Sequence, residues 1–308
     1  MLDTPNPSSV RLDLIWLELT GRCNLECVHC YADAGPGRPL DEGMQLPDWQ
    51  RALSEAALLG CRRVQFIGGE PTLHPGLPTL IEQAHKLGFE QICVFTNGMH
   101  LTEALRELFL RYQVQLAVSV YGSSAEVHDS ITQRRGSFAK TEQTLRWAVS
   151  AGLPVHGAII GLPQNDHDLA GSERRLNAAG LVSVGVDRIR RVGRGADSSP
   201  PQSPMGELCG RCGLDRLCIS ATGEIFPCVF ARFVSLGHAT QDSLISALLS
   251  STRTEFRHSL ATPARDLCQP DVPPIPCQPD VPPIPCQPDV PPIPCQPEVP
   301  PVPSVHLG

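Results

Sequence analysis

Three cysteines with the spacing C-x3-C-x2-C, Cys23, Cys27 and Cys30, are the residues of this 308-residue chain best suited to metal chemistry. Cysteine thiolates are the ligands that iron–sulfur clusters use, and three of them can hold a [4Fe-4S] cluster whose fourth iron has no protein ligand. Such an open iron can bind a small molecule, as a catalytic metal site requires. Structural zinc with His29 as fourth ligand is the alternative, although Cys27 and His29 are so close in sequence that tetrahedral closure is awkward.

A second group of cysteines has the spacing C-x2-C-x5-C-x9-C and comprises Cys209, Cys212, Cys218 and Cys228. Four thiolates are the number that a closed iron–sulfur or zinc site requires, and the spacing does not decide between these metals. The residues on either side of 221–223 predict a hairpin with a Gly turn. Because Cys218 lies between Leu217 and Ile219, it can equally be an interior strand residue, with Cys268 completing the site.

The elements that must position these cysteines are predicted by apolar runs bounded by turn residues. The runs lie at 12–19, 63–67, 91–96, 114–120, 154–160 and 184–190. Amphipathic stretches such as 48–59 predict five helices that alternate with the six strands. This alternation predicts parallel βα units and an α/β fold, an open six-stranded (β/α)6 partial TIM barrel. In such folds functional side chains gather past the C-terminal ends of the strands.

The sequence Cys-Asn-Leu-Glu-Cys-Val-His-Cys-Tyr at 23–31 resembles the cluster motif of the radical S-adenosylmethionine (radical SAM) superfamily. The resemblance is to the branch that carries a C-terminal iron–sulfur domain called SPASM or Twitch. Segments that follow the next three predicted strands are similar to further motifs of that family and occur in the same order. These segments are Gly68-Gly69-Glu70-Pro71, Phe95-Thr96-Asn97-Gly98, Ser119-Val120-Tyr121-Gly122, His128-Asp129 and Gly136-Ser137-Phe138.

The resemblance implies roles for individual residues around a [4Fe-4S] cluster with bound S-adenosylmethionine. The three motif cysteines would hold the cluster, Gly68 and Gly69 would let the backbone approach the methionyl group, and Glu70 would take its ammonium. The remaining implied cofactor contacts are Asn97 and Ile160 at the adenosyl group, and Ser119 with Arg134 or Arg135 at the carboxylate or ribose. The family often has an arginine soon after the His-Asp pair, whereas here Thr132 and Gln133 come first, so which of the two arginines acts is left open.

The cysteines at 209–228 resemble the first half of the SPASM region, whereas its usual second half is missing. This implies one auxiliary iron–sulfur cluster, of the [4Fe-4S] type, in a small C-terminal Cys-rich domain of the Twitch arrangement. In the superfamily, reductive cleavage of S-adenosylmethionine gives a 5′-deoxyadenosyl radical that takes a hydrogen atom from the substrate. An auxiliary cluster could then accept an electron, so the resemblance implies an oxidative modification, either crosslinking or dehydrogenation.

The expected substrate is a ribosomally made peptide. The alternative is a small secondary metabolite that undergoes dehydrogenation, decarboxylation or epimerisation. The implied electron donor is a protein such as flavodoxin or ferredoxin. Only about eleven residues precede the first predicted strand, too few for a peptide-recognition domain, so a separate recognition protein is expected.

Composition sets the remaining expectations. The net charge of −7 and the absence of a Lys/Arg block argue against nucleic acid or an anionic membrane as partner. Neither a signal peptide nor a membrane-spanning run is present in the sequence, and its thirteen cysteines suit a reducing compartment, so we expect a cytoplasmic protein. The predicted organisation is an N-terminal extension at 1–11, a radical SAM core at 12–195, the auxiliary-cluster domain at 196–262 and a tail at 263–308.

The tail contains four copies of a nine-residue repeat. Cys-Gln-Pro-Asp-Val-Pro-Pro-Ile-Pro begins at Cys268, Cys277 and Cys286, and Cys-Gln-Pro-Glu-Val-Pro-Pro-Val-Pro begins at Cys295. Four prolines in each repeat predict extended polyproline II or disorder, with successive cysteines roughly 28 Å apart. The tail could therefore be a spacer, could donate one thiolate to the auxiliary site, or could bind a partner that recognises prolines, which would make the protein partly a scaffold.

Overall fold

The computed structural model describes residues 11–196 and 203–260. Most of the predicted N-terminal extension and the whole predicted tail with its four cysteines, Cys268 included, lie outside the described residues. Six parallel strands, each paired with the next in chain order, form the body of one sheet. They are β1 (Leu14–Glu18), β2 (Arg63–Ile67), β3 (Gln91–Thr96), β4 (Gln115–Ser119), β5 (Val155–Gly161) and β6 (Ser183–Arg188). The predicted six-stranded α/β partial barrel is confirmed.

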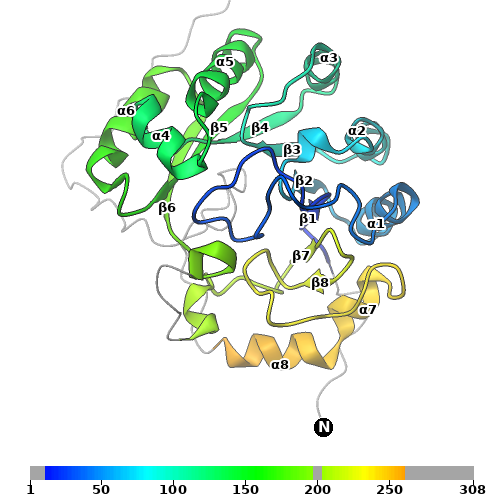
Figure 1. Ribbon diagram of the computed structural model, residues 1–308. Coiled ribbons are helices and arrows are strands. Elements are labelled where there is room, and N and C mark those ends of the chain that lie inside the picture. Colours follow the sequence, from blue (N-terminus) through cyan, green and yellow to red (C-terminus); the bar gives the residue numbers. More distant parts are fainter. Residues whose placement is uncertain (1–10, 197–202, 261–308) are drawn as a thin grey trace, which may run out of the picture.

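Helices connect successive strands and surround the curved sheet (Figure 1). They are α1 (Leu46–Leu58), α2 (Leu77–Lys86), α3 (Glu103–Arg111), α4 (Ala125–Thr132), α5 (Ser137–Ser150) and α6 (Leu169–Ala178), with short 3-10 turns η2 (Pro71–Leu73) and η3 (Asp166–Asp168). Each helix buries one apolar face; α1, for example, buries Trp49, Leu53 and Ala56 at helical spacing. The β4–β5 connection contains two helices, where the pattern predicted one, because Gln133 and Gly136 both have positive φ and break the helix between them.

The C-terminal region continues the same sheet. After η4 (Gly193–Ala196) and η5 (Pro204–Glu207), the predicted hairpin forms from β7 (Arg216–Ile219) and β8 (Ile225–Phe226), which pair antiparallel. Strand β7 also lies parallel to β1, which the sequence pattern did not predict, so the sheet has eight strands in the order β6-β5-β4-β3-β2-β1-β7-β8. Helices α7 (Leu244–Leu249) and α8 (Ser251–Ser259) complete the region. The boundary at 195/196 remains a prediction, and the sheet runs across it without a break.

Across residues 11–196 and 203–260, no helix combines the length and the apolar character needed to cross a bilayer.

Asp129, in α4, caps the N-terminus of α5. Its Oδ2 accepts a hydrogen bond from the Gly136 amide (2.6 Å), and its Oδ1 accepts from the Ser137 hydroxyl and the Phe138 amide (2.8 Å each). Burial works against the charge of Asp129, but the hydrogen bonds from Phe138, Gly136 and Ser137 outweigh it and lower the pKa of the carboxyl. Asp129 and Gly136-Ser137-Phe138, which resemble family motifs, therefore act here as a helix cap.

We predict that Asp129→Ala lowers the free energy of unfolding by about 1 kcal/mol near pH 7, the usual value of a lost cap. A carboxyl whose folded pKa is lowered stabilises the protein above its ordinary pKa of about 4 and loses that contribution as pH falls through the folded value. The difference in free energy of unfolding between Asp129→Ala and wild type, measured by urea unfolding, should therefore be smaller near pH 3 than near pH 7. Glu126→Ala, an exposed change in the first turn of α4, is the control, and equal losses in the two variants near pH 7 would contradict the capping role.

Candidate functional site

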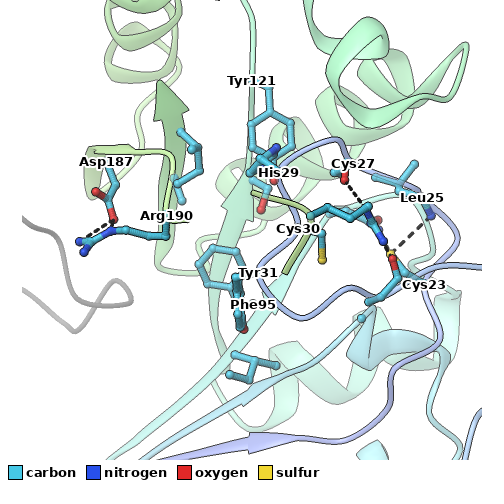
Figure 2. A pocket seen from close by; sticks show the side chains of 18 of the residues that line it. Cys23, Leu25, Cys27, His29, Cys30, Tyr31, Phe95, Tyr121, Asp187 and Arg190 are labelled. Atoms are coloured by element: carbon cyan, nitrogen blue, oxygen red, sulfur yellow. Dashed lines mark hydrogen bonds and ion pairs between the residues drawn. The ribbon is translucent and has the colours of Figure 1, made fainter. Parts of the chain in front are cut away.

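One cavity collects most of the predicted site residues at the C-terminal ends of the parallel strands. The predicted residues that line it are Cys23, Cys27, Cys30, Gly68, Gly69, Asn97, Ser119 and Ile160. Figure 2 shows the cysteines on one side and Asp187 with Arg190 on the opposite side, with Tyr31 and Phe95 between them. The loop after β1 thus faces the end of β6 across the cavity, and the other strand ends complete its wall.

The two glycines after β2 fix the loop that carries the cysteines. The Gly69 amide donates to the Thr20 carbonyl (2.6 Å) and the Glu70 amide to the Arg22 carbonyl (2.9 Å). A Cβ atom on Gly69 would lie 2.2 Å from the Arg22 carbonyl oxygen, and one on Gly68, whose φ is +131°, would lie 2.6 Å from the Thr20 carbonyl oxygen. Only glycine permits this approach, so both residues hold the cysteine loop as well as lining the cavity.

Glu70 does not line the cavity, so its expected contact with the methionyl ammonium stays a prediction. Its side chain is fully buried and accepts four hydrogen bonds within the protein. Oε1 accepts from the amide and hydroxyl of Thr72 and from the Thr96 hydroxyl, and Oε2 accepts from the Asn97 amide (2.8 Å). Burial raises the pKa of Glu70 and these hydrogen bonds oppose the rise. Glu70 therefore ties the end of β2 to the end of β3, one layer behind the cavity.

Asn97 connects the end of β3 to the cysteine loop. Its Nδ2 donates to Asn24 Oδ1 (2.7 Å) and lies 3.6 Å from the Cys23 sulfur, which also accepts from the Leu25 amide (3.4 Å). Hydrogen bonds to a cysteine sulfur stabilise its negative charge. Asn97 is thus placed to support the thiolate of Cys23.

Arg134 and Arg135 are the other predicted residues that the structure does not bring to the cavity. They fall in the turn between α4 and α5, both are exposed, and Arg134 donates to the Asn24 carbonyl (3.3 Å). Arg188, at the end of β6, and Arg190 and Arg194 after it line the cavity instead, and none of the three was predicted from the sequence. Arg194 donates to the backbone carbonyls of Cys27 (2.9 Å) and Ala34 (2.7 Å) and so braces the cysteine loop from the far side.

Asp187 and Arg190 form an ion pair at the β6 end of the cavity. Asp187 Oδ2 lies 3.3 Å from both Nε and Nη2 of Arg190, and Oδ1 accepts from the Arg188 amide (2.6 Å). Burial raises the pKa of Asp187 to about 7, against the opposing charge of Arg190. Arg188 also lines the cavity on this side and pairs with Glu207 (2.9 Å), so the β6 end presents two arginines, each paired with a carboxylate. The signal that could have found Asp187 is its position at a strand end.

His29 and Tyr121 supply an aromatic wall that sequence reasoning did not assign to the cavity. Their rings meet edge to face with centroids 4.7 Å apart. Burial, together with the charge of Arg194, lowers the pKa of His29 to about 4, so its ring is neutral at physiological pH. Its buried Nδ1 has no hydrogen-bond partner in the described part of the chain. The neutral His29 imidazole, between the motif thiols and the Tyr121 ring, is suited to contact a ligand in the cavity.

The donor set of the first cysteine group fits an iron–sulfur cluster. In the described ranges, no three His, Cys, Asp or Glu side chains are placed to share one metal ion. Ligands of a single zinc ion lie about 2.3 Å from it and hence within roughly 4 Å of one another, whereas a four-iron cluster separates its ligands further. Three thiols around one cavity therefore match a cluster better than zinc with His29. Burial, Glu70 and Cys30 raise the pKa of Cys23 to about 12, and metal coordination overcomes such a rise.

The second cysteine group gathers in one hydrophobic cluster. Cys212, Cys218 and Cys228 are buried there and Cys209 packs against it. The sulfurs of Cys212 and Cys228 lie 2.8 Å apart, longer than a disulfide bond of about 2.05 Å. Cys218 lies on the sheet face opposite to Leu217 and Ile219, which belong to the main core. Its side chain is thus on the same side as those of Cys212 and Cys228.

A buried ion pair connects the two cysteine groups. Glu18, at the end of β1, pairs with Arg232, and its side chain is 4% exposed. Tyr31, which follows Cys30 and lines the cavity, hydrogen-bonds to Glu18, and so does Cys218. One carboxylate therefore contacts the residue after the last motif cysteine and a thiol of the second group.

We predict that Gly69→Ala prevents the first cysteine group from binding iron and destabilises the protein. The new methyl group would meet backbone atoms of Arg22, which cannot rotate away, so the cysteine loop must move. The expected loss is about 1–3 kcal/mol in the free energy of unfolding, the usual cost of overpacking, with iron per chain reduced after anaerobic reconstitution.

The matched control is Gly37→Ala, in the same loop, where a Cβ would have no atom within 4 Å. This variant should retain wild-type iron and stability. If Gly69→Ala also does so, the backbone contact between residues 20–22 and 68–70 does not fix the cysteine loop.

Comparisons with known proteins agree with this geometry. A sequence model of the radical SAM superfamily matches residues 17–176, and one of an iron–sulfur cluster-binding domain, SPASM, matches residues 209–270. The first implies a [4Fe-4S] cluster with S-adenosylmethionine, and the second implies auxiliary iron–sulfur binding.

Two relatives come from Bacillus subtilis. The antilisterial bacteriocin subtilosin biosynthesis protein AlbA is 29% identical over 265 residues, which cover 73% of this chain and 57% of AlbA. The sporulation killing factor maturation protein SkfB is 25% identical over 295 residues, which cover 83% of this chain and 70% of SkfB. This chain therefore spans little more than half the length of AlbA.

Among solved structures, Streptococcus suis SuiB bound to precursor peptide SuiA has the same fold, with a TM-score of 0.68 and 13% identity over 80% of this chain and 67% of SuiB. The fold, the three motif cysteines on one cavity and a superfamily match over more than half of the residues lead to one conclusion: this chain belongs to the radical SAM superfamily and carries an SPASM iron–sulfur domain.

Proposed function

We propose that this chain cleaves S-adenosylmethionine reductively and oxidises a ribosomally made peptide by crosslinking or dehydrogenation. The observation that carries the proposal is a set of three thiols, Cys23, Cys27 and Cys30, on a cavity at the strand ends, with a second thiol group behind it. When bound, the cluster and S-adenosylmethionine supply a radical that abstracts hydrogen from unactivated carbon.

The chain's own residues bind and orient the cofactors. The three thiolates hold the cluster, and the backbone at Gly68 and Gly69 and the side chains of Asn97, Ser119 and Ile160 form the wall for S-adenosylmethionine. Glu70 acts through Asn97, because its carboxylate accepts a hydrogen bond from the Asn97 amide. The aromatic and aliphatic lining excludes water, which protects a reactive radical.

The second thiol group is proposed to hold one auxiliary [4Fe-4S] cluster through Cys209, Cys212, Cys218 and Cys228. The burial of Cys218 beside Cys212 and Cys228 supports it as a ligand. Cys268 lies outside the described residues but within the SPASM match, so it remains the alternative fourth ligand.

A peptide substrate is favoured over a small molecule because the relatives AlbA and SkfB, named for bacteriocin biosynthesis and maturation of a killing factor, cover 73% and 83% of this chain. A relative named GTP 3′,8-cyclase, from Pseudomonas fluorescens, covers 52%. The proposal also includes a flavodoxin or ferredoxin as electron donor, a separate peptide-recognition protein and a cytoplasmic location. The thirteen cysteines of the sequence suit a reducing compartment.

We predict that the protein, purified and reconstituted without oxygen and then reduced, forms 5′-deoxyadenosine from S-adenosylmethionine. Cys27→Ala should abolish this, because three thiolates leave no spare ligand for the cluster. Chromatography of the nucleoside product measures the effect. Cys61→Ala, in the core and away from the cavity, should keep both iron and activity. A colourless protein that contains zinc and forms no 5′-deoxyadenosine would refute the proposal.

The auxiliary site gives a separate prediction. Cys212→Ala should reduce iron from about eight to about four per chain, since each four-iron cluster has its own ligands. Cleavage of S-adenosylmethionine at the first cluster should persist. Cys93→Ala, a thiol on β3 that contacts Gln65, serves as control and should keep full iron content. Retention of full iron by Cys212→Ala would exclude this cysteine as a ligand.

A further inference from the structure

Three cysteines of the predicted tail have no role in the function proposed above. Cys277, Cys286 and Cys295 each begin a nine-residue repeat, and all three lie beyond residue 270, where the SPASM match ends. A spacer needs no thiol, and a ligand arm needs only one. Three cysteines at one fixed spacing instead indicate units that each undergo the same reaction.

We propose that these three repeats, residues 277–303, are a substrate of the cavity in the same chain. This inference rests on the proposed function and names its substrate: a Cys-containing, proline-rich peptide that is covalently part of the enzyme.

The described chain ends at a hydrophobic cluster that shares residues with the cavity wall. Leu260 packs against the hydrophobic cluster that contains Trp16 and Phe230, and Tyr31 and Phe95 pack against the same cluster. Phe230, Tyr31 and Phe95 also line the cavity. The seventeen residues from Leu260 to Cys277 can span up to roughly 55–60 Å, at 3.3–3.6 Å per residue. The later repeats reach further, so all three can enter the cavity in turn.

The chemistry of the cavity matches that of the repeats. Its apolar lining, which includes Ile67, Ile159 and Phe230, suits the Val-Pro-Pro-Ile-Pro part of each unit. Each of the three repeats also carries one carboxylate, at Asp280, Asp289 or Glu298.

Arginine at the β6 end of the cavity can receive that carboxylate. The Arg188 side chain is 46% exposed and lines the cavity, although it also pairs with Glu207 (2.9 Å). Arg190, which is paired with Asp187, lines the cavity on the same side. A guanidinium holds a carboxylate through charge-assisted hydrogen bonds and fixes its position. The repeat carboxylate at Arg188 would leave the Cys end of the unit free to reach the middle of the cavity.

The thiol is the strongest nucleophile in each repeat, so the reaction is assigned to it. One S–H and one C–H bond within the unit break and one C–S bond forms. S-adenosylmethionine is the oxidant: its sulfonium C–S bond breaks, giving methionine and 5′-deoxyadenosine, which keeps the hydrogen atom from carbon, while the thiol hydrogen leaves as a proton. One S-adenosylmethionine is consumed per unit, and the electrons balance without a further oxidant.

The test is mass spectrometry of the full-length chain after anaerobic reaction with S-adenosylmethionine and reductant, followed by proteolysis. Each modified repeat should lose the mass of two hydrogen atoms and become unreactive to a thiol-alkylating reagent. The Cys27→Ala chain should keep all tail thiols. The full-length Cys277→Ser, Cys286→Ser, Cys295→Ser variant should keep iron and form 5′-deoxyadenosine without any mass change in the tail.

Dilution separates reaction within one chain from reaction between copies. The rate per chain should stay constant over a hundredfold dilution, because a tether fixes the local concentration of the repeats. A rate that falls in proportion to concentration would overturn the assignment to the same chain. If 5′-deoxyadenosine forms fully but the repeats stay unmodified, the substrate assignment is overturned and the proposed function stands. If the protein contains no iron and forms no 5′-deoxyadenosine, the proposed function itself is refuted.

A charge test addresses how the repeats are held. Arg188→Ala should slow repeat modification about tenfold, whereas Arg174→Ala, an exposed change on α6, should not. In the cofactor-free full-length chain, hydrogen–deuterium exchange at residues 188–196 should be slower in wild type than in the Asp280→Asn, Asp289→Asn, Glu298→Gln variant. Equal exchange in the two chains, or equal modification rates in the two arginine variants, would overturn the role of the cavity arginines.

Discussion

The close backbone contact between the end of β2 and the start of the cysteine loop is the constraint on which the site depends. Amides of Gly69 and Glu70 donate to carbonyls of Thr20 and Arg22, at distances that no side chain on Gly69 would permit. The loop that must present three thiols is therefore held by main-chain atoms, so its own side chains remain available to the cavity. Glu70 extends the same restraint to β3 through Asn97.

The sheet joins the two cysteine groups into one assembly. Because β7 pairs with β1, the segment that carries the second group is an extension of the barrel sheet. Glu18, at the end of β1, then contacts both Tyr31 and Cys218, while Arg232 compensates its buried charge. A buried carboxylate is costly without a paired cation, so this pair links the folding of the C-terminal region to the geometry of the first site.

The cavity is chemically asymmetric. Thiols and the neutral ring of His29 occupy one side, and the Asp187–Arg190 pair with Arg188 occupies the other. In the proposed function the cofactors bind at the thiol side, which leaves the β6 side for recognition of a polar or anionic part of a substrate. Arg194 belongs to the thiol side, since its guanidinium holds the backbone of the cysteine loop.

Local patterns in the sequence determined the strands, the hairpin and the identity of both cysteine groups, because hydrophobic periodicity, turn residues and ligand spacing are properties of short segments. The strand-end rule also placed Asn97 and Ser119 on the cavity correctly. Tertiary structure alone decided three other points: Glu70 points into the protein, Arg134 and Arg135 lie outside the cavity, and Arg188, Arg190 and Arg194 line it. Whether a charged side chain faces a cavity depends on partners distant in sequence, such as Cys27 for Arg194. It also depends on strand pairings such as that of β1 with β7. No local sequence pattern encodes either kind of contact.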